Sequence, residues 1–195
     1  GKTVFVEGAL PGETVDYVSI RKKPTYEIAR TERIVKESSY RVSPKCPHYG
    51  VCGGCSMQHL DSSAQVAAKQ RLLESNLRHL GKLKAEQLYA PVYGAAWGYR
   101  SRARFSVFVP DTAGLALVGF HERKSSNIAE IEQCGNLLPH VSALIMPLRE
   151  LVSALSIKHS VPQIEIAVGE EVTVLVLRIL ESLKAADESL VRAFA

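Results

Sequence analysis

Three of the four cysteines in this chain fall within ten residues, in the segment Cys46-Pro-His-Tyr-Gly-Val-Cys52-Gly-Gly-Cys55. The fourth, Cys134, lies far downstream. Three clustered thiols plus one that the fold must bring to them is a common way to hold an iron–sulfur cluster, and the spacing is close to the plant-type pattern. The two glycines allow a tight turn that aims backbone N–H groups at sulfur. These four residues therefore predict a metal–thiolate site.

Other uses of the thiols fit the spacing less well. A structural zinc site needs the same thiolates but usually has two short Cys or Cys/His pairs. Disulfides are disfavoured because Cys52 and Cys55 are crowded and no signal peptide is visible. A radical S-adenosylmethionine enzyme would use Cys-x-x-x-Cys-x-x-Cys with one iron left open, whereas here Cys134 can supply a fourth ligand. Zinc remains the main alternative to an iron–sulfur cluster.

The composition is that of an ordinary soluble globular protein with one large domain or two small ones. The chain has 195 residues, 46% of them hydrophobic and 23% charged. No apolar run approaches the ~20 residues that span a bilayer, so we expect reduced cysteines in the cytoplasm and no membrane contact. The net charge is +4, and residues 1–60 carry nine Lys or Arg against six Asp or Glu. This modest basicity is compatible with RNA as a partner.

The segment Gly98-Tyr-Arg-Ser-Arg-Ala-Arg-Phe is the second stretch with chemical meaning. Residues two apart on a strand share a face, so Arg100, Arg102 and Arg104 would form a row with a spacing of about 6.5–7 Å. Such a row can meet successive phosphates or stack on unpaired bases. A solvent-facing strand is the plain alternative, but like charges on one face repel one another unless an anion is present. The basic turn with Arg123 and Lys124 would extend the surface, unless it is simply solvated.

The elements that precede and follow the cysteine loop can be read from periodicity and turn residues. Residues 3–7, 14–22 and 25–35 predict three strands, either a plain meander or a small OB-like barrel of the kind that binds oligonucleotides. Residues 62–80 predict a helix with a capping box at Ser62–Gln65 and a stop at Gly81. Its apolar stripe is expected to pack on a core; packing against a partner domain is the alternative.

The remainder of the chain predicts a mixed sheet with helices. We expect strands at 98–109, 114–120 and 127–131, the last ending just before Cys134. A helix at 138–155 should start or kink at Pro147, a hairpin should join 161–168 to 172–180, and a short helix should cover 187–194. The fold class predicted is α+β.

With these segments assembled, the chain resembles the RNA uracil-C5 methyltransferases that carry an iron–sulfur cluster, particularly those with an N-terminal TRAM domain that act on 23S ribosomal RNA. The motifs that carry the resemblance occur in the family's order and are spread over most of the chain. They are Gly8-Ala-Leu-Pro-Gly-Glu13, the cysteine loop with Gln58-His59, Trp97-Gly-Tyr-Arg-Ser-Arg-Ala-Arg104, Val118-Gly-Phe-x-Glu-Arg123 and Ile131-Glu-Gln-Cys134.

The resemblance implies specific roles for these residues. The four cysteines would hold a structural 4Fe–4S cluster near bound RNA, and Arg100, Arg102 and Arg104 would lie on the RNA-binding face. Residues 1–40 would be a truncated TRAM barrel without its first strand, 41–60 the cluster-binding loop and 61–195 a mixed α/β central domain.

The chain departs from the family in its chemistry. Uracil-C5 methylation needs a cysteine nucleophile, a base and an S-adenosylmethionine site with a glycine-rich turn. All four cysteines are assigned to the cluster, and no such turn is present. We therefore expect no catalytic or cofactor-binding residues here, with S-adenosylmethionine bound only by the full-length enzyme. The chain would be a monomeric RNA-recognition portion, inactive alone.

Two functions of other classes remain open on sequence grounds. One is a free-standing RNA-binding module, stabilised by zinc or a cluster, without catalysis. The other is an electron-transfer protein, whose cluster would have to cycle reversibly.

Overall fold

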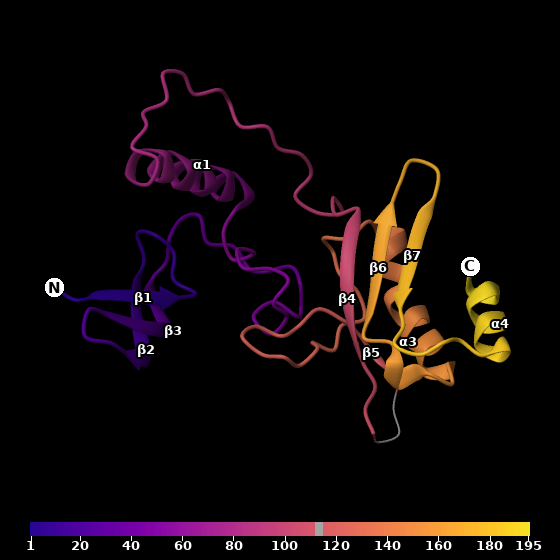
Figure 1. Cartoon of the computed structure of the whole chain (residues 1–195). Helices are drawn as coiled ribbons and strands as arrows, with labels where there is room; N and C mark the ends of the chain where they lie inside the picture. Colours follow the sequence, from indigo (N-terminus) through magenta and orange to yellow (C-terminus); the bar gives the residue numbers. More distant parts are fainter. Residues whose placement is uncertain (112–114) are drawn as a thin grey trace. The chain divides into compact units, whose positions relative to one another are not determined.

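The computed structural model describes residues 1–111 and 115–195, and these form two compact units. One unit comprises Gly1–Lys45 and Met57–Val92, and the other comprises Cys46–Ser56 and Tyr93–Ala195. Each unit contains one β-sheet, so the predicted α+β class is confirmed (Figure 1). Within the described ranges, no helix has the length and apolar character needed to cross a membrane.

The first unit contains a three-stranded sheet that matches the three predicted strands. They are β1 (Thr3–Glu7), β2 (Thr14–Lys22) and β3 (Tyr26–Lys36). The order is β1-β3-β2, with β1 parallel and β2 antiparallel to the central β3. Among the described residues this sheet is open and does not close into a barrel. The OB-like barrel therefore remains a prediction.

Glu13 fastens the turn before β2 to the segment that follows β3. Its carboxylate accepts hydrogen bonds from the backbone N–H of Leu10 and of Ser38 and pairs with the Arg41 guanidinium at 2.6 Å. The hydrogen bond from Arg41, opposed by burial, is the main reason that the pKa of Glu13 falls to about 2. The segment that follows β3 is thus fixed against the turn that precedes β2.

Helix α1 (Ser62–His79) forms where predicted, but its N-cap and its packing differ from expectation. The N-cap is Asp61, whose carboxylate accepts the N–H of Ser63. Gln65 donates backwards to the carbonyls of Met57 and Leu60, so the predicted capping box is wrong. No residue of α1 is buried, and Leu73 is 59% exposed. The predicted packing of its apolar stripe on a core is therefore also wrong.

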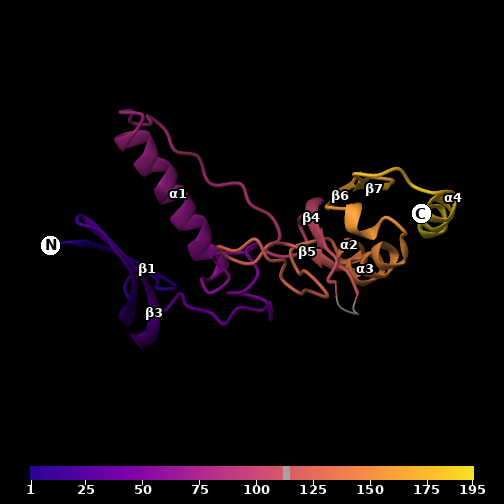
Figure 2. The same ribbon diagram turned by 60° about the horizontal axis from the view of Figure 1, so that its bottom comes forward.

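The second unit contains a four-stranded antiparallel sheet covered on one face by helices. The strands are β4 (Arg102–Phe108), β5 (Leu117–Gly119), β6 (Gln163–Val168) and β7 (Thr173–Arg178), in the order β5-β4-β6-β7. The helices are α2 (Pro139–Ala143), α3 (Ile145–Ala154), the short 3-10 helix η1 (Lys158–Ser160) and α4 (Ala185–Phe194). Figure 2 shows α2 and α3 together beside this sheet.

The hydrophobic core of the second unit lies between the sheet and α3. Phe105 of β4 and Ile164 of β6 are register partners, and both are fully buried. They belong to one cluster with Leu148 of α3, while Phe194 of α4 packs against its edge. Alternate strand residues thus face the core, and the residues between them face outward.

Several predicted elements of this unit form differently. The hairpin β6–β7 and helix α4 are confirmed, but the strand expected at 98–109 begins only at Arg102. The strand expected at 114–120 forms at Leu117–Gly119, and its predicted first residue, Gly114, lies outside the described residues. The prediction of a strand at 127–131 is wrong, because only a single β-bridge forms there, between His121 and Ile128. Cys134 therefore does not follow a strand.

The helix predicted at 138–155 is two helices that meet at Leu144. Pro147 is the third residue of α3, in its first turn. Backbone N–H groups in the first turn of a helix have no acceptor within the helix, so proline, which has no N–H, loses no hydrogen bond there. The expectation that Pro147 marks a start or kink is confirmed.

Asp187 ties α4 to the loop that follows α3. It is 1% exposed, and its carboxylate accepts the N–H and the hydroxyl of Ser156, both at 2.7 Å, and the N–H of Lys184 at 3.0 Å. The hydrogen bonds from Ser156, followed by that from Lys184, lower the pKa of Asp187. The ionised form is therefore the one that stabilises the fold.

We predict that Asp187→Asn lowers the melting temperature by several degrees and reduces the acid sensitivity of the fold. A carboxyl whose folded-state pKa is depressed stabilises the fold above its unfolded-state pKa, about 3.9 for aspartate. That contribution is lost as the pH falls through the folded-state pKa. Thermal melts between neutral pH and pH 3 check this, with Glu188→Gln, an exposed change in the same helix, as the control. Equal melting curves for the two variants would contradict the prediction.

Candidate metal centre and arginine surface

The cysteine loop is a series of tight turns that are closed by backbone hydrogen bonds. The N–H of Tyr49 donates to the carbonyl of Cys46 at 3.1 Å, and the N–H of Cys52 donates to the carbonyl of His48 at 2.9 Å. The Tyr49 hydroxyl donates to the carbonyl of Ser56 at 2.9 Å and so joins the two ends of the loop. The loop therefore has a defined conformation of its own.

The loop is docked by its backbone on the turn that follows β5. The Gly53 N–H donates to the carbonyl of His121, and the Arg123 N–H donates to the carbonyl of Val51, both at 2.8 Å. A Cβ on Gly53 would lie 2.9 Å from the His121 oxygen, which is closer than real Cβ atoms approach. Only glycine therefore fits at this position without moving backbone.

The four cysteines are half-buried and unpaired by disulfides. Several sulfurs accept N–H groups: Asn136 Nδ2 lies 3.0 Å from Cys55 Sγ, and the backbone N of Gly54 lies 3.4 Å from Cys52 Sγ. Cys134 is held through its backbone, because its N–H donates to the Ser142 hydroxyl of α2 at 2.8 Å. Donors of this kind orient thiolate ligands and stabilise their charge.

The four thiols influence one another electrostatically. Burial is the main cause that raises the pKa of Cys52, and repulsion from the Cys55, Cys134 and Cys46 thiolates raises it further. Burial likewise raises the pKa of Cys134, with smaller contributions from Cys55 and Cys46. The structure therefore brings the remote Cys134 into the neighbourhood of the loop. A bound cation would reverse this repulsion and favour the thiolates.

The donor set of the four thiols can be compared with the known kinds of thiolate site. Among the described residues, no three Cys, His, Asp or Glu side chains converge closely enough to hold one metal ion. Thiols with N–H···S contacts are compatible with a zinc ion and with an iron–sulfur cluster alike.

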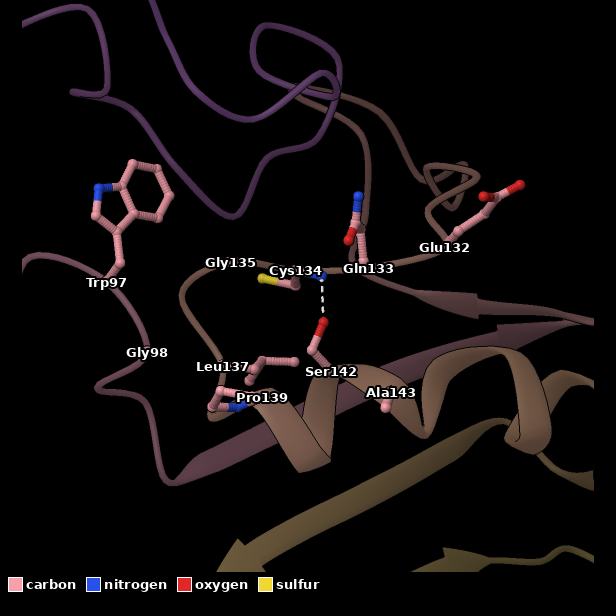
Figure 3. Close-up of a pocket in the computed structure, with 10 residues that line it drawn as sticks. All are labelled: Trp97, Gly98, Glu132, Gln133, Cys134, Gly135, Leu137, Pro139, Ser142 and Ala143. Atoms are coloured by element: carbon pink, nitrogen blue, oxygen red, sulfur yellow. Dashed lines mark hydrogen bonds between the residues drawn. The ribbon is translucent and has the colours of Figure 1, made fainter.

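A cavity of about 600 Å³ lies beside Cys134 (Figure 3). Trp97 forms one wall and packs on the backbone of Gly135, where a Cβ would lie 3.1 Å from the indole ring. Figure 3 shows the Cys134 sulfur on the side of Trp97, and the hydrogen bond from the Cys134 N–H to the Ser142 hydroxyl on the other side of the residue. The cavity is lined by Trp97, Gly98, Glu132, Gln133, Cys134, Gly135, Leu137, Pro139, Ser142 and Ala143.

The predicted row of three arginines is divided in the structure. Arg102 and Arg104 are exposed on the outer face of β4, across from Ala167 and Glu165 of β6. Arg100 precedes the strand and is not part of this row. Its guanidinium carbon lies 5.5 Å from the centroid of the Phe120 ring. The reason is that the chain there pairs with the loop before α2, through a bridge to Leu137.

Arg178 is a further cation on the outer face that sequence reasoning missed. Its Nε lies 2.7 Å from Glu165 Oε1, and Arg104 Nε lies 3.9 Å from the same oxygen. The hydrogen bond from Arg178 is the first cause that lowers the pKa of Glu165. The signal in the sequence was the alternation of β7, which puts Arg178 on the face of the exposed Val174 and Val176.

The other two predicted cations lie next to the cysteine loop. Arg123 is half-buried and is fixed by its backbone hydrogen bond to Val51, whereas Lys124 is exposed and has a positive φ of 57° at the tip of the turn. The structure therefore brings Arg123, Lys124 and Arg100 to the cysteine site. Arg102 and Arg104 belong to the sheet face.

Together these features define a four-thiol site beside an arginine-rich surface. Over all 195 residues the chain is 60% identical to proteins from Cupriavidus pinatubonensis and Cupriavidus necator named 23S rRNA (uracil(1939)-C(5))-methyltransferase RlmD. It is 59% identical to the protein of that name from Burkholderia thailandensis. The chain spans 42–44% of the length of these relatives. They confirm the resemblance to the uracil-C5 methyltransferases of 23S ribosomal RNA. No protein-family model matches the chain.

We predict that Gly53→Ala lowers the free energy of unfolding by about 1–3 kcal/mol, the usual cost of overpacking a tight site. The added methyl group would press on the backbone carbonyl of His121 and undock the loop. Gly54→Ala is the matched control, because its Cβ would make only ordinary contacts of 3.5–3.7 Å with Cys52 and Phe120. Denaturant melts of both variants check the prediction, and an equal loss in the two would contradict it.

Proposed function

We propose that this chain is the RNA-recognition and iron–sulfur portion of an S-adenosylmethionine-dependent enzyme that forms 5-methyluridine in 23S ribosomal RNA. The observation that carries the proposal is the 60% identity over the whole chain to relatives with that activity in their name. In this proposal the chain is the N-terminal part, and residues 1–40 act as a TRAM-like RNA-binding domain. The nucleophile and the S-adenosylmethionine site belong to the part of the relatives that it does not span, so it is inactive alone.

Cys46, Cys52, Cys55 and Cys134 would hold a 4Fe–4S cluster in this proposal. Their mutual electrostatic influence and the N–H···S contacts support a shared thiolate site. The sequence spacing of three clustered cysteines and one remote cysteine favours a cluster over a single zinc ion. The bound cluster would supply a covalent link between the loop and Cys134 rather than methyl-transfer chemistry. The loop residues, in turn, set the position of the turn that carries Arg123 and Lys124.

The RNA-binding residues in this proposal are Arg100, Arg102, Arg104, Arg123 and Lys124, with Arg178 as an addition. The exposed guanidiniums of Arg102 and Arg104 on one sheet face can meet phosphates, which supply most of the affinity in nucleic-acid binding. The exposed apolar residues of α1, such as Leu73, would contact the remaining part of the longer enzyme.

We predict that the anaerobically purified chain contains iron and acid-labile sulfide in equal amounts and absorbs in the visible range. Cys134→Ser should abolish both signals, because it removes the ligand that closes the site, whereas Ser189→Ala in α4 should leave them intact. Elemental analysis measures the iron and zinc, a sulfide assay measures the acid-labile sulfide, and an absorption spectrum records the visible bands. Stoichiometric zinc without iron would overturn the cluster assignment and favour the alternative of a zinc-stabilised RNA-binding module.

We predict that the chain binds a labelled single-stranded oligouridine with an affinity that falls as salt rises. Arg102→Gln or Arg104→Gln should weaken binding and reduce the slope of log affinity against log salt by about 0.7 per lost phosphate contact. Arg192→Gln removes the same charge from α4 and should leave the slope unchanged. Fluorescence anisotropy at several salt concentrations checks this. An absence of binding at low salt would refute the RNA-binding role of this surface.

A further inference from the structure

Arg100 is held from three directions at the boundary between the cysteine loop and the arginine surface. Its backbone N–H donates to the carbonyl of Asn136 at 2.9 Å, and its Nε donates to the carbonyl of Arg102 at 2.9 Å. Its guanidinium lies over the ring of Phe120 within the range of a cation–π contact. The side chain nevertheless remains exposed. It is therefore both positioned by protein groups and accessible to a ligand.

Phe120 makes one connection from the cysteine loop to Arg100. The backbone of Gly54 packs beside the Phe120 ring, since a Cβ there would lie 3.6 Å from a ring carbon. The N–H of Gly54 donates to Cys52 Sγ. The ring also packs on Phe105 of the core, with the centroids 5.3 Å apart. Phe120 is therefore in contact with both the core and the loop that carries Cys52.

Asn136 makes a second, independent connection. Its side-chain Nδ2 donates to Cys55 Sγ at 3.0 Å, and its carbonyl accepts the backbone N–H of Arg100 at 2.9 Å. A single residue therefore contacts both a candidate cluster ligand and the arginine. Groups that hydrogen-bond a ligand sulfur orient the ligand and are oriented by it in return.

We propose that Phe120 and Asn136 are positioning residues that couple the cysteine site to Arg100, so that loss of the metal cluster weakens RNA binding through this arginine. The inference rests on the proposed function and extends it from a structural cluster to one that governs a defined RNA contact. The ligand of Arg100 is single-stranded RNA, met at a phosphate or an unstacked base.

Simple electrostatics predicts the opposite effect, which makes the coupling testable. A cluster held by four thiolates carries net negative charge, and this charge is lost when the cluster is removed. Cluster removal would therefore reduce repulsion of the RNA and tighten binding if charge alone mattered. In the proposed coupling, the loss of the Arg100 contact outweighs this gain.

The experiment measures oligouridine binding by anisotropy for the native chain and for Arg100→Gln, each with the cluster loaded and after anaerobic chelation of iron. In the native chain, cluster removal should weaken binding, by no more than Arg100→Gln does in the loaded state. In Arg100→Gln, cluster removal should leave the affinity unchanged or tighten it. The proposal would be overturned if cluster removal left the affinity of the native chain unchanged. It would also be overturned if cluster removal lowered the affinity of both chains by the same factor.

Variants of the loaded protein give a second measurement that does not depend on the stability of the metal-free chain. Phe120→Leu removes the ring face but keeps an apolar side chain, and it should weaken binding roughly two- to five-fold, the value of an exposed cation–π contact. Phe120→Tyr keeps the ring and should bind as the native chain does. Neither Phe120→Leu nor Asn136→Ala should weaken binding further in the Arg100→Gln background. Full additivity with Arg100→Gln would contradict the coupling.

These outcomes separate the coupling from the function on which it rests. If the proposed function fails, the chain lacks iron or does not bind oligouridine at any salt concentration. If only the coupling fails, iron and binding are both present but independent of one another. Asn136→Ala adds a spectroscopic readout, because loss of the N–H···S contact should lower the reduction potential of the loaded cluster.

Discussion

The docking of the cysteine loop depends on one close backbone contact, between Gly53 of the loop and the carbonyl of His121. At 2.8 Å from N to O, with no room for a Cβ, the contact requires glycine. It fixes the loop against the turn after β5 while Cys134 is fixed separately by Ser142. Two segments about eighty residues apart in sequence are thus each fixed by hydrogen bonds within the same unit.

The thiols and the arginines near this contact each favour groups of the opposite charge. Half-buried thiols repel one another as thiolates and so favour either a proton or a metal cation. The arginines nearby favour an anion, and Arg100 partly satisfies this need on the electron-rich face of Phe120. A cation–π contact leaves the guanidinium edge available for hydrogen bonds, unlike a bidentate carboxylate pair. Arg100 is therefore positioned by the protein and can still bind an anion.

Periodicity and spacing predicted the parts of the fold that are decided locally. The strands β1 to β3, the hairpin β6–β7 and helix α1 follow from alternation, turn residues and helical spacing. The four thiols were proposed as one site from their chemistry and spacing alone. What sequence could not provide was the choice among distant partners. The segment 127–131 has strand-like residues but bonds mainly to the turn at 120–122, and Arg100 is drawn out of register by Leu137 and Phe120.

The outer face of the sheet combines exposed ion pairs with a row of cations that could bind a polyanion. Glu165 lies between Arg104 and Arg178 and relieves the repulsion that parallel rows of guanidiniums would otherwise suffer. Exposed pairs of this kind contribute at most about 1 kcal/mol, so a phosphate can displace the carboxylate at small cost. The same pairing keeps the guanidiniums extended across the sheet before a ligand arrives, which reduces the entropy lost on binding. A carboxylate in the middle of a cationic face is thus compatible with the RNA binding that we propose for it.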